Sequence, residues 1–261
     1  MVRRGVAPTR SEAAVSIRAG LVTVGGRPAL KASTLVGADE PIAIAGPGRR
    51  FVSRGGEKLD AGLSRFAIEV AGRRALDAGA STGGFTDCLL ARGASAVVAV
   101  DVGYGQLDWR LRQDPRVVLM ERTNVRDLRP EDLPYAPEVV AADLSFISLR
   151  LAFPALARCA APGADLVALV KPQFEAGRAA VGRGGVVRDA DVWRTVLSEV
   201  AAAAGAEGLG VRGVMVSPLL GPAGNAEFVL WATARAVTGL LPDGEVDAAI
   251  AEANALVDRD G

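Results

Sequence analysis

The stretch Asp77-Ala78-Gly79-Ala80-Ser81-Thr82-Gly83-Gly84 joins an apolar run to a helical pattern that begins at about Phe85. A strand that runs into a glycine-rich turn and then a helix brings backbone N–H groups and a helix N-terminus against a ligand. The turn departs from the dinucleotide fingerprint G-x-G-x-x-G, because Ser81 stands where a glycine would approach a pyrophosphate. It fits better the looser acid-x-G-x-G-x-G turn of proteins that bind nucleoside–methionine compounds, again with Ser81 in place of a glycine. We expect the cofactor to be held by Asp77, Gly79, Ser81, Thr82, Gly83, Gly84 and Phe85.

Asp101 adds a second acid at a suitable distance along the chain. It ends the next apolar run, 22 residues after Gly79, close to the spacing of roughly 20 residues expected of a ribose-binding acid. We therefore expect Asp101 to bind the cofactor ribose. A glycine turn that serves only strand–helix packing is the alternative.

Apolar runs alternate with helical patterns over most of the remaining chain. Seven runs are strand candidates: 74–77, 96–101, 117–121, 139–143, 166–171, 211–216 and 227–232. Helical stretches between the first several strands predict a doubly wound α/β fold with a seven-stranded sheet. Residues 243–257 predict a C-terminal helix.

The first 46 residues have a different pattern and predict a small separate domain. A helix capped by Thr9 or Ser11 is followed by an alternating strand at 21–24, the two-residue turn Gly25-Gly26 and a last strand at 42–44. Residues 47–52 are expected to be a linker because of their glycine, proline and arginine, and residues 53–261 to form the larger domain.

The chain contains no histidine, so proton chemistry near neutral pH must use other side chains. Lys58, Asp143, Lys171 and Glu227 are our candidate catalytic residues, because the fold would gather them at one edge of the sheet. This requires that the seventh strand be antiparallel, so that its start meets the ends of the others. Taken singly, each of these residues is more readily explained as a solvated surface charge.

Two lysines and two carboxylates near a methyl donor suit methyl transfer to a hydroxyl. A ribose 2′-hydroxyl is a poor nucleophile and must lose its proton during the attack. A lysine can take that proton when burial or a second cation lowers its pKa. We expect Lys171 to be the base, with the carboxylates holding the lysines in register and favouring the positive transition state.

Residues near this edge also suggest contact with nucleic acid. Phe146, three residues after Asp143, is placed to stack on a base that has left a helix, although a core phenylalanine is the equal alternative. Arg178 and Arg183 lie in a glycine-rich stretch after Lys171 and are candidate phosphate contacts. An ordinary surface loop explains that stretch almost as well.

Charge and cysteine content narrow the function class. Residues 1–58 carry 10 basic and 4 acidic side chains, whereas the rest carry 20 and 26, so a basic front end precedes an acidic body. The two cysteines, Cys88 and Cys159, stand in no CxxC pattern, so we expect no metal. No signal peptide or membrane-length apolar run is found, which predicts a cytoplasmic protein without a membrane partner.

Five motifs resemble those of the TlyA family. They are Ser53-Arg54-Gly55-Gly56-Glu57-Lys58-Leu59, the turn from Asp77 to Thr86, Asp101-Val102-Gly103-Tyr104-Gly105-Gln106-Leu107, Asp143-Leu144-Ser145-Phe146-Ile147-Ser148 and Val170-Lys171-Pro172-Gln173-Phe174-Glu175. The resemblance covers nearly the whole chain. It implies an S4-type RNA-binding domain followed by a Rossmann-like class I methyltransferase domain of the FtsJ type. It also implies S-adenosylmethionine as cofactor and a Lys-Asp-Lys-Glu tetrad at Lys58, Asp143, Lys171 and Glu227.

Members of that family, first labelled hemolysins, are ribosomal RNA 2′-O-methyltransferases that act on cytidines of 23S RNA and, in one subtype, of 16S RNA. The resemblance therefore implies ribosomal subunits as partners. Within residues 1–46 it makes Arg4, Arg10, Arg18 and Lys31 candidate RNA contacts. The family carries a helix before the segment Arg3-Arg4-Gly5, so we expect the first domain to be truncated at its N-terminus.

Three other functions remain open at this point. A non-catalytic RNA-binding protein would have the same first domain with a retired enzyme behind it. A membrane-lytic protein would fit the old family label, but no cationic amphipathic helix supports it. A nicotinamide-dependent dehydrogenase is disfavoured by Ser81.

Overall fold

The structure is a computed structural model of the 261-residue chain, and it describes residues 1–7, 10–18, 20–29, 31–44, 50–177, 180–235, 241 and 243–260. The chain divides into two compact units, Met1–Arg50 and Phe51–Gly261. The division falls within the expected linker at 47–52, of which residues 47–49 lie outside the described residues. Each unit has its own core, so each is described by itself.

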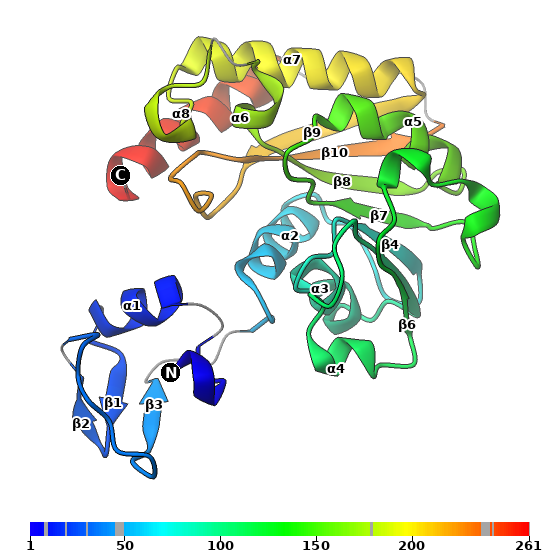
Figure 1. Ribbon diagram of the computed structural model, residues 1–261. Coiled ribbons are helices and arrows are strands. Elements are labelled where there is room, and N and C mark those ends of the chain that lie inside the picture. Colours follow the sequence, from blue (N-terminus) through cyan, green and yellow to red (C-terminus); the bar gives the residue numbers. More distant parts are fainter. Residues whose placement is uncertain are drawn as a thin grey trace. The chain divides into compact units, whose positions relative to one another are not determined.

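The first unit is a short helix on a small antiparallel sheet (Figure 1). Its elements are η1 (Val2–Arg4), α1 (Arg10–Arg18), β1 (Val22–Val24), β2 (Arg27–Pro28) and β3 (Ile42–Ile44). The strand order is β2-β1-β3. Gly25 and Gly26 turn β1 into β2 with φ of 57° and 78°, the positive values that a two-residue hairpin of this type requires. The hairpin expected at these glycines is therefore confirmed.

The core of the first unit is small. Ile17 of α1 packs with Val22 of β1 and Ala29, and Met1, Val24 and Ile42 close around them. Arg4 fastens η1 to a distant loop by donating to the backbone oxygens of Gly37 and Glu40, at 2.6 Å each. A unit with so few buried apolar side chains gains little from burial alone.

The second unit is built on a seven-stranded mixed sheet in the order β6-β5-β4-β7-β8-β10-β9. The strands are β4 (Arg74–Ala78), β5 (Ala96–Val100), β6 (Val117–Met120), β7 (Val139–Ala142), β8 (Asp165–Val170), β9 (Leu209–Val216) and β10 (Phe228–Ala234). All seven expected strands are present. The five from β4 to β8 pair in parallel, and β10 is antiparallel to both β8 and β9.

Helices cover both faces of this sheet (Figure 1). They are α2 (Arg54–Arg65), α3 (Gly84–Ala91), α4 (Trp109–Arg112), α5 (Leu149–Cys159), α6 (Pro172–Glu175), α7 (Ala190–Ala206) and α8 (Asp243–Asp260). In the described residues, short 3-10 turns between them include η2 (Val125–Asp127), η3 (Pro130–Asp132) and η5 (Arg183–Gly185). The expected C-terminal helix is α8, which runs three residues further than the pattern indicated.

The two faces of the sheet take alternate residues of each strand, as the pleat requires. In β4, Ala75 points to the side where Leu59 and Leu63 of α2 pack. Leu76 points to the other side, where Phe153 of α5 and Leu197 of α7 pack. Because these strands are buried on both faces, they appear in the sequence as continuous apolar runs. The layers are therefore helix, sheet, helix, and the doubly wound fold is confirmed.

The strand ends that could form a ligand site lie at one edge of the sheet. The parallel strands β4, β5, β7 and β8 all finish at this edge, and β10 begins there, because Phe228 pairs with Val170. The condition set for the seventh strand is thus met. Among the described residues, no helix is long and apolar enough to span a membrane.

Candidate active site

A cavity of about 480 Å³ opens beyond the carboxyl ends of β4, β5 and β7. Its lining draws on four segments: the glycine turn after β4, residues 100–106, residues 123–126 and residues 143–147. Of the residues expected to hold the cofactor, Gly79, Ser81 and Asp101 line this cavity. Asp143 and Phe146 line it as well, which places the expected reaction centre beside the expected cofactor site.

Asp101 organises the polar side of the cavity. Its Oδ2 accepts a hydrogen bond from the backbone N–H of Ser81 at 2.8 Å, and its Oδ1 accepts one from that of Gly103 at 2.6 Å. Each carboxylate oxygen has a further lone pair. Asp101 can therefore hold the turn in place and also accept from ligand hydroxyls.

The glycines of the turn are required by close packing. Gly79 has a φ of 91°, and a Cβ there would lie 2.5 Å from the backbone oxygen of Asp143. At Gly84, the first residue of α3, a Cβ would lie 2.0 Å from Oγ of Ser53. The turn thus brings the end of β4 against the start of the β7–α5 loop. Ser81 keeps a φ of 48°, a value that glycine adopts more readily.

Asp77, by contrast, does not reach the cavity. The side chain is fully buried, Oδ2 accepts from the hydroxyl of Thr86 at 2.6 Å, and Oδ1 has no hydrogen-bond partner. Burial raises the pKa of Asp77 to about 7, the hydroxyl of Thr86 lowers it, and the nearby carboxylates of Asp143 and Asp101 add to the increase. Thr82, Gly83, Gly84 and Phe85 are also absent from the lining.

The first of two ion pairs joins α2 to the start of β10. Nζ of Lys58 lies 2.6 Å from Oε2 of Glu227, and both side chains are buried. Lys58 stands one helical turn before Gly62, where a Cβ would lie only 2.7 Å from Val229 of β10. The absence of a side chain at Gly62 lets α2 approach the strand, and this approach brings Lys58 to Glu227.

The second ion pair lies on the neighbouring strands. Nζ of Lys171, directly after β8, is 2.6 Å from Oδ1 of Asp143, directly after β7. This contact is electrostatic, since Oδ1 has no partner at a hydrogen-bond angle. The same Nζ donates to Oγ of Ser145 at 3.0 Å and lies 5.9 Å from the centre of the Phe174 ring. Lys171 is 9% exposed and does not itself line the cavity.

The register of the sheet brings these two pairs together. Glu227 and Lys171 flank the paired residues Phe228 and Val170, so they are neighbours on antiparallel strands. Asp143 follows Ala142, which pairs with Ala168 of β8. All four candidate catalytic residues therefore sit at one sheet edge.

Phe146 is not a core residue. It is 91% exposed, its φ is 63°, and its ring centre lies 5.3 Å from that of Phe174. A bulky residue in the left-handed region is costly, and such strain collects at functional sites. A second cavity, of about 510 Å³, is lined by both rings of this aromatic pair and by four residues that follow Phe174: Gly177, Val181, Gly182 and Gly185. Arg178 lies outside the described residues, as does the side chain of Arg183.

Three of the four expected RNA contacts of the first unit share one cavity. Arg4, Arg10 and Lys31 line a hollow of about 630 Å³ whose remaining lining is largely apolar. Arg18 is exposed and does not line it. The guanidinium of Arg4 is engaged with the Gly37–Glu40 loop, so its contribution is at least partly structural.

Comparison with known proteins follows the same division of the chain. The model of the S4 domain matches residues 1–42, and that of the FtsJ-like methyltransferase matches residues 51–234. A protein of Mycobacterium tuberculosis named 16S/23S rRNA (cytidine-2′-O)-methyltransferase TlyA is 51% identical over 249 residues, which are 95% of this chain and 93% of the relative. The chain belongs to the TlyA family of FtsJ-like methyltransferases.

Two solved structures are also similar over most of the chain. A protein of Streptococcus thermophilus described as a hemolysin has a TM-score of 0.82 at 39% identity, with 99% of this chain and 94% of that chain covered. A Lactococcus lactis protein with the same description has a TM-score of 0.75 at 40% identity, covering 78% and 98%. Membership of the family confirms that the chain is a methyltransferase and that S-adenosylmethionine is its cofactor.

Sequence reasoning missed several residues of the site. Nothing in the sequence singles out Ser145, yet its hydroxyl oxygen accepts a hydrogen bond from Nζ of Lys171. Gln106, Asn124 and Arg126 line the cofactor cavity, and they stand in loops whose paths the strand pattern did not fix. Phe174 lies within a quoted motif, but its pairing with Phe146 depends on two loops meeting in space. No group of three or more His, Cys, Asp or Glu side chains in the described part of the chain is arranged to hold a metal ion.

Proposed function

We propose that this methyltransferase acts on the ribose 2′-hydroxyl of cytidines in ribosomal RNA, in 23S RNA and with 16S RNA as a second substrate. The substrate is proposed because the M. tuberculosis relative is named for that activity and because an S4 domain precedes the catalytic unit. The observation that carries the proposal is the presence of two ion pairs, the buried Lys58–Glu227 and the partly buried Lys171–Asp143, beside a cavity that Asp143 itself lines.

The residues of this chain divide the work as follows. S-adenosylmethionine, when bound, supplies an electrophilic methyl group on a sulfonium. Asp101, Gly79 and Ser81 are the residues that would hold it, since they line the cavity and Gly79 leaves no room for a Cβ beside the backbone of Asp143. This fit agrees with the fold rule that ligands bind beyond the carboxyl ends of the strands.

Lys171 is the proposed proton acceptor. Its Nζ must be the neutral amine when the substrate hydroxyl gives up its proton, and Asp143 and Ser145 fix the position of that nitrogen. Lys58 and Glu227 lie deeper in the protein, so we assign them to orienting the substrate oxygen and to balancing charge at the same edge. Positioned acid–base groups contribute about 10²–10⁴-fold to rate.

Recognition of RNA is proposed to involve both units. Phe146 is the exposed ring on which an unstacked base would lie. Residues 1–46 would serve as the RNA-binding module through Arg10, Arg18 and Lys31, with Arg4 holding the module together and residues 47–52 linking it to the catalytic residues 53–261.

The test is methyl transfer to purified ribosomal subunits that lack the modification. We expect label from S-adenosylmethionine in RNA of the large subunit, recovered as 2′-O-methylcytidine after nuclease digestion and mass spectrometry. Label in the small subunit would establish the second substrate. Label on a base or on protein, or no label with folded protein, would contradict the proposal.

A further inference from the structure

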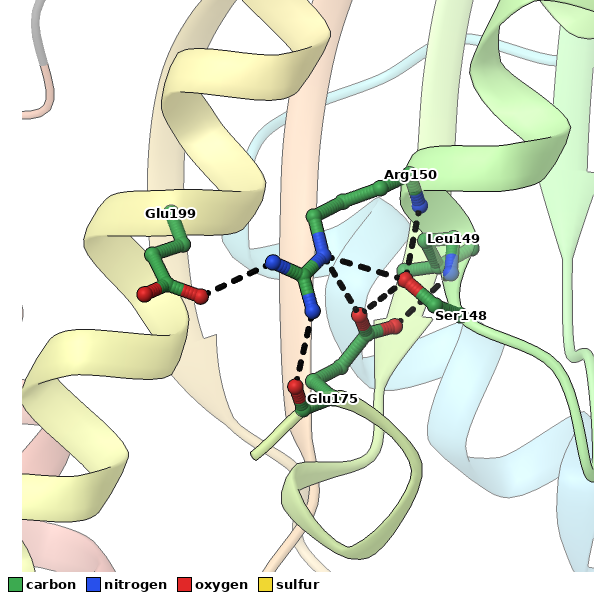
Figure 2. Close-up of polar contacts among 5 residues, drawn as sticks. All are labelled: Ser148, Leu149, Arg150, Glu175 and Glu199. Carbon is green, nitrogen blue, oxygen red and sulfur yellow. Dashed lines mark hydrogen bonds and ion pairs between the residues drawn. The ribbon is translucent and has the colours of Figure 1, made fainter. Parts of the chain in front are cut away.

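Glu175 is a buried carboxylate that belongs to none of the four catalytic candidates, and it stands at the centre of a polar network (Figure 2). It is the last residue of α6 and is 4% exposed. Its Oε1 accepts from the backbone N–H of Leu149 at 2.7 Å, and its Oε2 accepts from the hydroxyl of Ser148 at 2.5 Å. A buried charge with such complete pairing is expensive to assemble, so its placement calls for a reason.

Arg150 supplies the countercharge and extends the network (Figure 2). Its Nε lies 3.5 Å from Oε2 of Glu175, and its Nη2 donates to the backbone oxygen of the same residue at 2.8 Å. Its Nη1 reaches Glu199 of α7 at 2.9 Å. One guanidinium therefore holds both the side chain and the backbone of Glu175.

The network joins the two segments that carry the reactive side chains. Ser148 caps α5 and closes the loop that begins with Asp143 and includes Phe146. Glu175 closes the segment that begins with Lys171 and includes Phe174. Across the two segments, Lys171 meets Asp143 at 2.6 Å and the Phe146 ring meets the Phe174 ring at 5.3 Å.

We propose that Glu175 is a positioning residue for methyl transfer: by tying residues 171–175 to residues 148–150, it sets Lys171 against Asp143 and Phe174 against Phe146. This inference rests on the proposed function for its consequence in catalysis. Glu175 touches neither Lys171 nor the cofactor cavity, so it acts through the two segments. If Glu175 served only to cap α5, its replacement would not change the position or the mobility of residues 171–175.

The variant to make is Glu175→Gln. It keeps the shape of the side chain and the oxygen that accepts from the N–H of Leu149, but it removes the negative charge that pairs with Arg150. The matched control is Glu199→Gln, because Glu199 pairs with the same guanidinium of Arg150 and not with residues 143–148 or 171–175. We expect Glu175→Gln to lower kcat for methyl transfer to ribosomal RNA at least tenfold with KM for S-adenosylmethionine changed less than threefold. Glu199→Gln is expected to change neither.

Hydrogen exchange read by mass spectrometry tests the tie without any turnover. In Glu175→Gln, peptides covering 143–149 and 171–177 are expected to exchange faster together, and in Glu199→Gln neither changes. If Glu175→Gln does not fold, Ser148→Ala replaces it, since this change removes one of the donors to Glu175.

Two results would contradict the positioning role, and a third would separate it from the proposed function. An unchanged kcat, or faster exchange confined to 143–149, would overturn the positioning role. If the wild-type protein transfers no methyl group to RNA while the two peptides still respond together, the proposed function fails and the tie between the segments stands.

Discussion

At the scale of the residue, the site is defined by which lysine forms an ion pair with which carboxylate. The sequence predicted that Asp143, Lys171 and Glu227 at strand ends would meet Lys58 of the preceding helix at one edge of the sheet, and the structure puts all four there. It did not show that Lys58 pairs with Glu227 and Lys171 with Asp143, because that pairing depends on how closely α2 approaches β10. Nor did it show that Asp77, expected at the cofactor, is fully buried.

Asp77 leads to a prediction about pH. Burial raises its pKa from 3.8 to about 7, so between these values the folded chain holds a proton that the unfolded chain has lost. The free energy of unfolding should therefore fall as pH rises from about 4 to about 7, by up to about 4 kcal/mol, and level off above. Urea unfolding of wild type and Asp77→Asn at pH 5 and pH 8 checks this. The variant should gain stability relative to wild type at pH 8; an equal difference at both pH values would refute it.

Phe146 leads to a prediction about RNA. Because its ring is 91% exposed, Phe146→Ala should leave the melting temperature unchanged or slightly higher. Loss of stacking, about 1–3 kcal/mol per base, should lower kcat/KM for RNA roughly ten- to hundredfold. Trp109→Ala is the control, since Trp109 is another exposed aromatic at 70% and lines neither cavity at the site. Equal effects of the two changes on kcat/KM would show that stacking at Phe146 is not specific.

At the scale of the element, long apolar strands were predictable and short elements were not. All seven strands, the β1–β2 hairpin and α8 follow from apolar period and turn residues. The four-residue helices α4 and α6 were not foreseen, because so few residues cannot show a period of 3.6. Yet α6 carries Phe174 and Glu175, so the part of the site that sequence reasoning missed lies where local signals are weakest.

The packing of α2 on the sheet gives a prediction about glycine. Gly62→Ala improves helix propensity by about 1 kcal/mol, but its Cβ would lie 2.7 Å from Val229 and force α2 outward. We expect a net loss of stability of about 1–3 kcal/mol and lower activity through displacement of Lys58. Gly244→Ala in α8 is the matched control, because nothing lies within 4 Å of the added Cβ. Thermal melts decide it: a higher melting temperature for Gly62→Ala would show that α2 has room to spare.

At the scale of the whole molecule, the chain is two units with separate cores, and the charge asymmetry of the sequence follows the same division. Fold class and family were accessible from sequence because the motifs lie at strand ends along nearly the entire chain. The loops that line the cavities were not, since their paths depend on contacts between distant segments.

Charge reversal on the first unit should separate binding from folding. The double change Arg10→Glu and Arg18→Glu is expected to weaken affinity for ribosomal RNA at least tenfold at 100 mM salt and to flatten its salt dependence. Melting of the larger unit should be unaffected, since its core is separate. The control Arg65→Glu with Arg212→Glu makes the same charge change on the second unit. Filter binding at several salt concentrations is the measurement, and an equal loss in both variants would indicate a non-specific effect of charge.

The role of Lys171 as the base is tested by the single-turnover rate of methyl transfer to ribosomal RNA by wild type and Lys171→Ala, with S-adenosylmethionine affinity measured on the same samples. We expect the rate to be at least a hundredfold lower in the variant, with cofactor affinity changed by only a few fold, because Lys171 is absent from the lining of the cofactor cavity. A folded Lys171→Ala protein that transfers methyl groups at the wild-type rate would contradict the assignment of the base.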